Sequence, residues 1–150
     1  MPLLRAFILL SFVVLAVPAA EARQMDDMNT AVLRTIDKVS ARTRTFDVPV
    51  GKTVKFGSGL FIKPRACRKA GPLENPEDAA FLQIWERKAT EEKAAWVFSG
   101  WMFSSNPALS VMDHPVYDVW VIACKDADVK GDDAFIEEDT PEETVSPDTD

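Results

Sequence analysis

The chain has 150 residues, of which 47% are hydrophobic, and a formal net charge of −7. This length suits a single domain with one core. We expect no nucleic acid partner, and the single histidine, His114, excludes most metal and acid–base sites built on several histidines.

The N-terminal segment has the order of features found in a cleaved signal peptide. Arg5 supplies a positive charge, residues 6–17 are apolar, and Ala20-Glu21-Ala22 forms an Ala-x-Ala cleavage site. The apolar run is too short to span a bilayer as a helix. We therefore expect cleavage near Ala22, which would remove residues 1–22 and leave a periplasmic or secreted protein without a membrane span.

Charge and apolar content divide the rest of the chain into a domain and two extensions. From Lys125 onward there are eleven acidic residues against two basic ones, and Phe135 is the only aromatic residue. Such a segment cannot bury enough apolar surface to fold. We expect a flexible lead-in at residues 23–30, a folded domain at residues 31–125 and a disordered acidic tail at residues 126–150.

The domain consists of short runs of β-branched and aromatic residues separated by turn signals. This pattern predicts a mostly β fold, a small antiparallel β-sandwich or barrel of about seven strands. We expect residues 69–78 to form a long surface connection and residues 104–112 to contain one short helical turn. The predicted strands are Ala31–Val39, Thr43–Val50, Lys52–Phe56, Leu60–Cys67, Phe81–Arg87, Ala95–Ser104 and Tyr117–Cys124.

The two cysteines, Cys67 and Cys124, each end a predicted strand. In a small exported protein a disulfide is the expected state, and it would tie the last strand to the middle of the fold. The alternative is a pair of buried thiols. The two strands could lie side by side in one sheet or face each other across two.

Four tryptophans, Trp85, Trp96, Trp101 and Trp120, are many for a domain of this size. Simple alternation places Trp96 and Trp101 on opposite faces of their strand, and neither face is polar. The rings could fill the core, or they could present an aromatic face to a ligand or partner.

Our leading hypothesis is a non-enzymatic domain that binds another envelope component, a protein or a glycan. The candidate binding residues lie around the aromatic block and around the histidine: Trp101, Phe103, His114, Tyr117, Asp118 and Trp120. Basic residues two apart on predicted strands form a candidate basic face: Arg42, Arg44, Lys63 and Arg65.

Two alternative functions come from other classes. A small envelope hydrolase or lyase could use Asp118, which lies within an apolar strand, together with His114. A carrier could hold an apolar ligand in a cavity lined by the tryptophans. The sequence has no phosphate-binding loop, nucleophile elbow or metal-binding spacing, so we expect no cofactor and no metal.

Five segments of the domain carry a specific pattern. The longest are residues 98–109, with Ser99-Gly100-Trp101-Met102-Phe103, and residues 114–124, with His114-Pro115-Val116-Tyr117-Asp118-Val119-Trp120; the others are residues 48–57, 65–69 and 74–81. Together they resemble the alphaproteobacterial family called domain of unknown function 2155, over roughly residues 31–125. The resemblance implies a periplasmic location in a Gram-negative envelope, and both cysteines fit the family pattern. No activity is assigned to that family.

Overall fold

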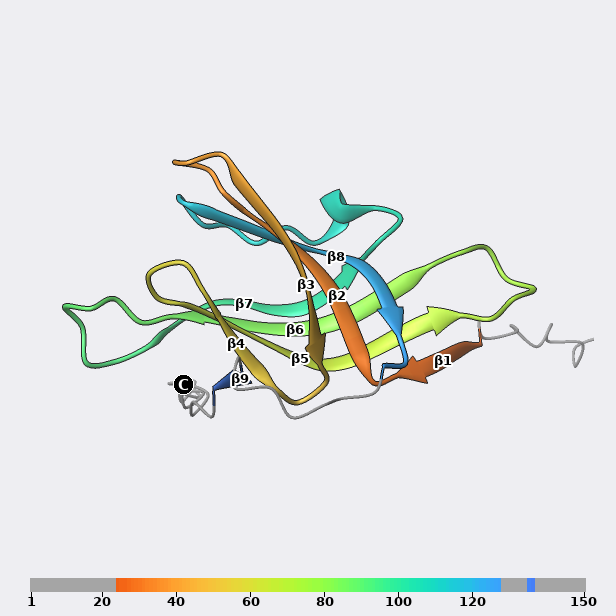
Figure 1. Ribbon diagram of the computed structural model, residues 1–150. Coiled ribbons are helices and arrows are strands. Elements are labelled where there is room, and N and C mark those ends of the chain that lie inside the picture. Colours follow the sequence, from red (N-terminus) through yellow and green to blue (C-terminus); the bar gives the residue numbers. More distant parts are fainter. Residues whose placement is uncertain (1–23, 128–134, 137–150) are drawn as a thin grey trace, which may run out of the picture.

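The computed structural model describes residues 24–127 and 135–136, which form two antiparallel β-sheets packed face to face (Figure 1). The large sheet has six strands in the order β7-β6-β5-β4-β9, with β1 paired to β5 beside this row. The small sheet has three strands in the order β3-β2-β8. The predicted signal peptide and most of the predicted acidic tail lie outside the described residues.

The elements follow one another along the chain with short connections. The strands are β1 (Met25–Met28), β2 (Thr30–Asp37), β3 (Arg42–Pro49), β4 (Thr53–Phe56), β5 (Leu60–Ala70), β6 (Asp78–Glu86), β7 (Ala95–Phe103), β8 (Tyr117–Lys125) and β9 (Phe135–Ile136), and a short 3-10 helix, η1 (Pro107–Leu109), lies between β7 and β8.

The predicted fold class is confirmed. Each of the seven predicted strands corresponds to one of β2 to β8, and η1 is the short helical turn expected within residues 104–112. The predicted connection at residues 69–78 is shorter in the structure, because β5 extends to Ala70 and β6 begins at Asp78.

The structure differs from the sequence prediction at both ends of the domain. β1 lies where a flexible lead-in was expected; it pairs with the last residues of β5, and Asp27 lies opposite Arg68. Its two central residues are acidic, so it lacks the apolar alternation by which strands are recognised. β9 lies within the segment expected to be a disordered tail and pairs with Thr53 and Val54 of β4.

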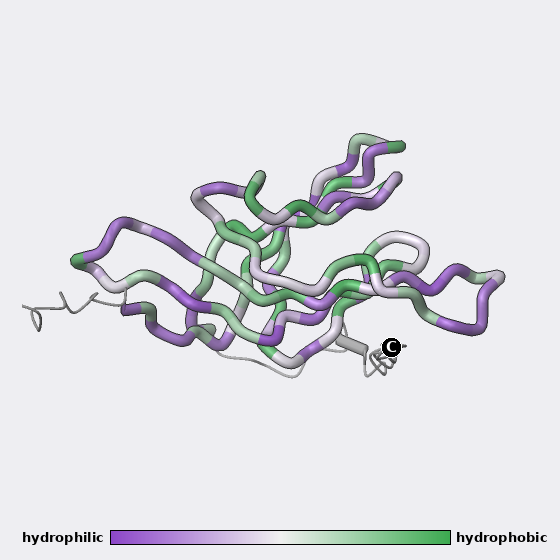
Figure 2. The backbone as a smooth tube through the Cα atoms, turned by 180° about the vertical axis from the view of Figure 1, so that it is seen from behind, coloured by the Kyte–Doolittle hydropathy of each residue, from purple (hydrophilic) through white to green (hydrophobic). Residues whose placement is uncertain are grey.

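The core lies between the two sheets and consists mainly of aliphatic side chains. The members that are completely buried include Leu33, Ile62, Leu82 and Ile84. Figure 2 shows hydrophobic residues where the two sheets overlap and hydrophilic residues along much of the projecting hairpins. This distribution places the two sheets as the two layers of a sandwich, each with an outer surface.

The hairpin between β4 and β5 turns at Gly57, which has a φ of 61°. A β-carbon there would collide with the ring and hydroxyl of Tyr117 on β8. Glycine therefore meets both the backbone and the packing requirement of this turn. No helix in the described part of the chain has the length and apolar character needed to cross a membrane.

Candidate functional site

The outer surface of the large sheet carries five aromatic rings. We call this surface the aromatic face and define it by Phe61 on β5, Phe81 and Trp85 on β6, and Trp96 and Trp101 on β7. Residues paired directly across neighbouring strands point to the same side of a sheet, and the register pairs Phe61 with Trp85, Trp85 with Trp96 and Phe81 with Trp101.

The five rings form two groups of contacts. Trp85 stacks on Phe61 with ring centroids 5.9 Å apart, and its other neighbour is Trp96, edge to face at 5.9 Å. Phe81 meets Trp101 edge to face at 5.6 Å. These offset and edge-to-face geometries are the favourable ones for aromatic pairs. The intervening residues of β5 and β6, including Ile62, Leu82 and Ile84, point to the core instead.

A β-bulge brings Trp96 and Trp101 to the same side of β7. The pairing of β6 with β7 shifts between Ile84 and Trp85, so that Val97 is left without a direct partner. One extra residue reverses the alternation beyond it. The sequence prediction that the two tryptophans lie on opposite faces is therefore wrong.

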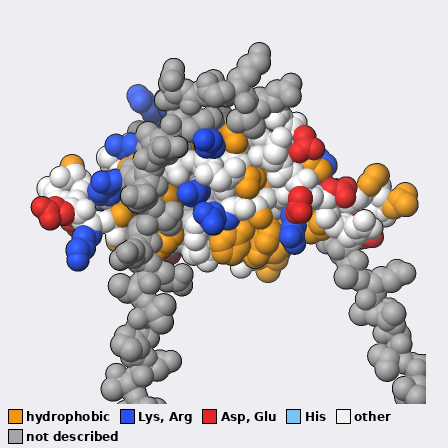
Figure 3. All heavy atoms as spheres, turned by 90° about the horizontal axis from the view of Figure 1, so that it is seen from below, with side chains coloured by type: hydrophobic (Ala, Val, Ile, Leu, Met, Phe, Trp, Pro, Cys, Tyr) orange, Lys and Arg blue, Asp and Glu red, His pale blue; other side chains and the backbone are white. Residues whose placement is uncertain are grey.

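Cationic side chains lie directly over these rings. Lys55 and Arg87 lie over Phe61, with their charged groups 5.7 and 5.6 Å from the ring centroid, and Arg68 lies over Trp101 at 5.5 Å. Such contacts combine the attraction of a cation for an aromatic ring with burial of the aliphatic stem. Figure 3 shows hydrophobic side chains gathered on this surface with Lys and Arg side chains beside them.

The aromatic face also carries an excess of positive charge. Lys63 follows Phe61 by two residues on β5 and pairs with Gln83 between the two ring groups. Arg68 donates from Nε to Asp27 at 2.9 Å. Lys55, Lys63 and Arg68 thus outnumber the one carboxylate that pairs with them among the described residues.

Two indole N–H groups of this face have no hydrogen-bond partner in the described part of the chain. They belong to Trp85, which is completely buried, and to Trp96, which is half-buried. A buried donor without an acceptor costs about 1–3 kcal/mol. Both nitrogens are buried, so these donors belong to the packing of the rings rather than to the exposed surface.

The predicted binding residues do not form one site. Trp101 belongs to the aromatic face, and Phe103 follows it by two residues on β7. Trp120 lies on the outer surface of the small sheet, where it pairs with Arg34, since its neighbours Val119 and Val121 are buried in the core. Trp101 and Trp120 therefore lie on opposite outer surfaces of the sandwich.

His114 and Tyr117 are buried structural residues. The rings stack at 5.2 Å, and Nδ1 of His114 accepts hydrogen bonds from the backbone N–H groups of Val116 and Tyr117 at 3.1 and 3.0 Å. The other ring nitrogen lies 3.4 Å from Glu86. These contacts fix the chain as it enters β8.

Asp118 is paired with Lys38 rather than with the histidine ring. The Lys38 ammonium donates to the Asp118 carboxylate at 3.1 Å and to the backbone carbonyl of His114 at 2.6 Å. The structure thus brings the two candidate catalytic residues near one lysine without joining their side chains. General acid–base chemistry needs the two groups within reach of one substrate, and this arrangement does not provide it.

The residues of the predicted basic face also lie at different places in the structure. Arg42 and Arg44 line a cavity of about 300 Å³ beside Tyr117, whereas Lys63 belongs to the aromatic face. Arg65 lies at a second β-bulge, where the register of β5 shifts between Pro64 and Ala66. Asp37 also lines the cavity; hydrogen bonds from Ser40 are the main cause that lowers the pKa of its carboxyl.

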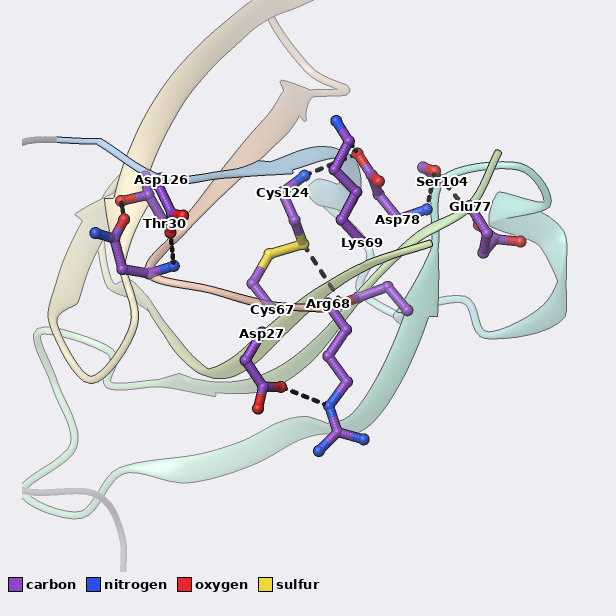
Figure 4. The surroundings of a disulfide bond; sticks show 12 residues. Asp27, Thr30, Cys67, Arg68, Lys69, Glu77, Asp78, Ser104, Cys124 and Asp126 are labelled. Atoms are coloured by element: carbon purple, nitrogen blue, oxygen red, sulfur yellow. Dashed lines mark hydrogen bonds and ion pairs between the residues drawn. A yellow bond between two sulfur atoms is a disulfide. The ribbon is translucent and has the colours of Figure 1, made fainter. Parts of the chain in front are cut away.

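The disulfide connects the two sheets. Cys67 of β5 and Cys124 of β8 are joined, with Cα atoms 5.6 Å apart (Figure 4). The backbone N–H of Cys124 donates to Asp78 at 2.9 Å. Of the two arrangements that the sequence left open, the structure has the one in which the cysteines face each other across the sandwich.

Beside the disulfide lies a cavity of about 420 Å³ whose lining includes Glu77, Asp78 and Ser105. Burial opposes ionisation of Glu77, but hydrogen bonds from Ser105 and Ser104 outweigh it and lower the pKa of this carboxyl. The carboxylate therefore orders the connection that precedes β6. The described residues contain no group of three or more His, Cys, Asp or Glu side chains that could hold a metal ion.

Comparison with known proteins gives one family and one curated relative. Residues 31–124 match the profile of a family described as "Uncharacterized protein conserved in bacteria (DUF2155)". The chain is also similar to "Uncharacterized protein RP359" of Rickettsia prowazekii (strain Madrid E), with 29% identity over 89 residues. That match spans 59% of this chain and 56% of the relative, so the chain covers little more than half of the relative's length. No solved structure matches significantly.

Proposed function

This chain belongs to the DUF2155 family of bacterial proteins, and we propose that its β-sandwich is a non-enzymatic binding domain of the cell envelope. The aromatic face is the binding surface in this proposal. The partner is another envelope component, a protein or a glycan, that offers both apolar and anionic groups.

The observation that carries the proposal is the combination of rings and cations on one outer sheet surface. A mainly aliphatic core holds the two sheets together, and on the outer surface Phe81, Trp96 and Trp101 stay partly exposed, whereas Phe61 and Trp85 are buried. Aromatic and arginine side chains are the residues enriched in binding surfaces, and the cations attract an anionic partner before contact.

The two alternative functions have less support. A hydrolase or lyase based on Asp118 and His114 would need their side chains to act together, and each has other partners. A carrier needs tryptophans around an internal cavity, but Trp85, Trp96 and Trp101 belong to the aromatic face and Trp120 to the opposite outer surface.

Export to the periplasm is part of the proposal. The disulfide supports it, because disulfides persist in oxidising compartments. Mass spectrometry of the protein purified from the periplasm should find Arg23 or a neighbour as the first residue. Retention of residues 1–17 in that protein would contradict export with cleavage.

The test of the binding role is a pull-down from the native envelope with the mature protein as bait. In one variant, Lys63→Gln and Arg68→Gln together neutralise two cations of the aromatic face. The matched control, Arg42→Gln with Arg44→Gln, neutralises two cations on β3 of the small sheet.

We expect the first variant to lose the captured protein or glycan and the control to retain it. Equal loss in both variants would mean that capture depends on overall charge, and unchanged capture by the first variant would exclude the aromatic face.

A further inference from the structure

The outer edges of the two sheets differ in how they are protected, and β1, which pairs with the end of β5, carries Asp26 and Asp27. β3, at one edge of the small sheet, carries Arg42, Arg44 and Asp47, and β8, at the other, carries Asp118 and Lys125. The β4 edge of the large sheet is paired by β9.

β7 forms another edge of the large sheet and has none of these protections. Its nine residues, Ala95–Phe103, include no charged residue and no proline, and among the described residues it pairs with β6 alone. A long, uncharged edge strand presents a row of backbone groups that can pair with another strand.

The register shows which backbone groups of β7 are available. Ser104 donates its N–H to the carbonyl of Asp78 at 2.8 Å, so these opposed residues form a hydrogen-bonded pair. Hydrogen-bonded and non-hydrogen-bonded pairs alternate along antiparallel strands. Met102 and Gly100 therefore bond to β6, and the N–H and C=O groups of Phe103, Trp101 and Ser99 point away from it.

The same three residues have their side chains on the side of the large sheet that carries the aromatic face. In a strand added to β7, the residues opposite them would project to this side as well, because paired residues share a face. Arg68 lies over the ring of Trp101, and among the described residues its hydrogen bond to Asp27 uses only Nε. Acidic side chains at alternate positions of the added strand would thus come close to a guanidinium group with free donors.

We propose that β7 binds an extended acidic peptide of a partner protein as an additional strand, with its carboxylates on the cationic side of the sheet. This inference rests on the proposed function and specifies how the aromatic face would engage its partner. Backbone pairing supplies the hydrogen bonds, and the alternate acidic side chains supply the selectivity.

Charge favours this occupant over a second copy of the chain. Pairing two β7 strands would place two cationic surfaces, each with Lys55, Lys63 and Arg68, in one continuous sheet and would add no carboxylate beside them. The carboxylates of an acidic peptide would instead come nearest to Arg68, the cation that lies over the ring of Trp101 on β7. The expected partner is therefore a heterologous segment with acidic residues at every second position.

The test uses the isotope-labelled mature protein and a synthetic nine-residue peptide of alternating Glu and Val. Hydrogen exchange of individual amides is measured with and without this peptide. We expect exchange at Ser99, Trp101 and Phe103 to slow at least about tenfold, with little change at Gly100 and Met102, which are already bonded to β6. A peptide with the same composition but with its Glu residues in one block should protect these amides less.

A pair of variants adds an independent measurement. Ser99→Pro removes an outward N–H at an exposed edge position, where proline is tolerated, whereas Ser99→Thr keeps it. We expect the proline variant to lose peptide binding and the threonine variant to retain it. If the proline variant does not fold, the alternating exchange pattern of the wild-type protein remains the deciding result.

Several outcomes would overturn the inference. Absence of peptide binding would do so, as would peptide binding without protection of the β7 amides; the pull-down with the Lys63→Gln and Arg68→Gln variant judges the proposed function separately. Binding of polygalacturonate, an anionic glycan, in place of the peptide would identify a glycan partner. If the β7 amides of the peptide-free protein were protected in a concentration-dependent way, the edge would bind a second copy of the chain. If they were protected without peptide and removal of residues 137–150 abolished this protection, the edge would bind the chain's own acidic segment.

Discussion

The interior between the sheets and the aromatic face are both apolar, but they are built from different residues. The interior is closed and consists mainly of aliphatic side chains such as Leu33, Leu82 and Ile84. The aromatic face consists of rings with cationic side chains over them. The difference indicates that stability depends chiefly on the interior, whereas the aromatic face has a composition suited to binding.

Truncation of one residue in each region should give the largest difference in stability between the interior and the aromatic face. Leu82 is completely buried, so Leu82→Ala should lower the free energy of unfolding by about 2–5 kcal/mol through lost burial and a cavity. Trp101 is half-buried, and Trp101→Ala should cost only about 1–2 kcal/mol despite the larger group removed.

Denaturant unfolding of both variants, together with the pull-down, gives the two measurements. We expect the leucine variant to keep its partner below its unfolding transition and the tryptophan variant to lose it. A larger loss of stability for Trp101→Ala than for Leu82→Ala would reverse the assignment of roles.

The disulfide crosses the interior, so its removal should have the next largest effect on stability. It closes a loop with a sequence separation of 57 between Cys67 and Cys124. The double variant Cys67→Ser with Cys124→Ser should lose about 2–4 kcal/mol of stability, chiefly because the unfolded chain gains freedom.

The bond itself is checked by counting free thiols in the unfolded, unreduced protein, where burial cannot mask them. We expect none. Two reactive thiols would show that the disulfide is absent, and the support that it gives to export would be lost.

The turn at Gly57 tests packing at the margin of the interior. Gly57→Ala should cost about 1–3 kcal/mol, because alanine is strained at this positive φ and its methyl group would collide with Tyr117. Gly51→Ala is the matched control, since Gly51 also has a positive φ but open space around it. Equal losses in thermal unfolding would show that backbone strain alone accounts for the effect.

The sequence predicted the fold better than it predicted the faces of the strands. Runs of β-branched and aromatic residues located β2 to β8 because this signal is local. β1 and β9 depend on partners far away in the chain, so local patterns could not reveal them.

The site was predicted only in part, for two reasons. Trp101, Phe103 and Lys63 were among the predicted residues and lie on β7 and β5 as expected. The bulge at Val97, which turns Trp96 to the same side as Trp101, has no reliable sequence signal. His114 and Trp120 lie elsewhere, because closeness to the aromatic block in sequence does not determine which sheet a strand joins. Arg68 was not among the predicted site residues, and a search for cations opposite aromatic residues could have found it.

The smallest expected effect is a pH dependence that belongs to neither region. Among the described residues, the carboxyls with a lowered pKa are Asp37 and Glu77, both next to turns and connections. A carboxyl whose pKa is lower in the folded protein stabilises the fold at pH values above its ordinary pKa, and this contribution is lost as the pH falls through the folded value. The ordinary values are 3.8 for Asp37 and 4.5 for Glu77, so the loss should begin below about pH 4.5.

Thermal unfolding between about pH 6 and about pH 3 measures this contribution. Glu77→Gln should lower the unfolding temperature slightly near pH 6, because a neutral amide accepts weaker hydrogen bonds from Ser104 and Ser105, and should make the temperature fall less steeply in acid. Asp26→Asn, at an exposed position of β1, is the control and should leave the slope unchanged. If Glu77→Gln had the same slope as the wild-type protein, the acid sensitivity would have to arise from other carboxyls. A change in partner capture by the same variant would show that the connection before β6 communicates with the aromatic face, and the separation of the two regions would then fail.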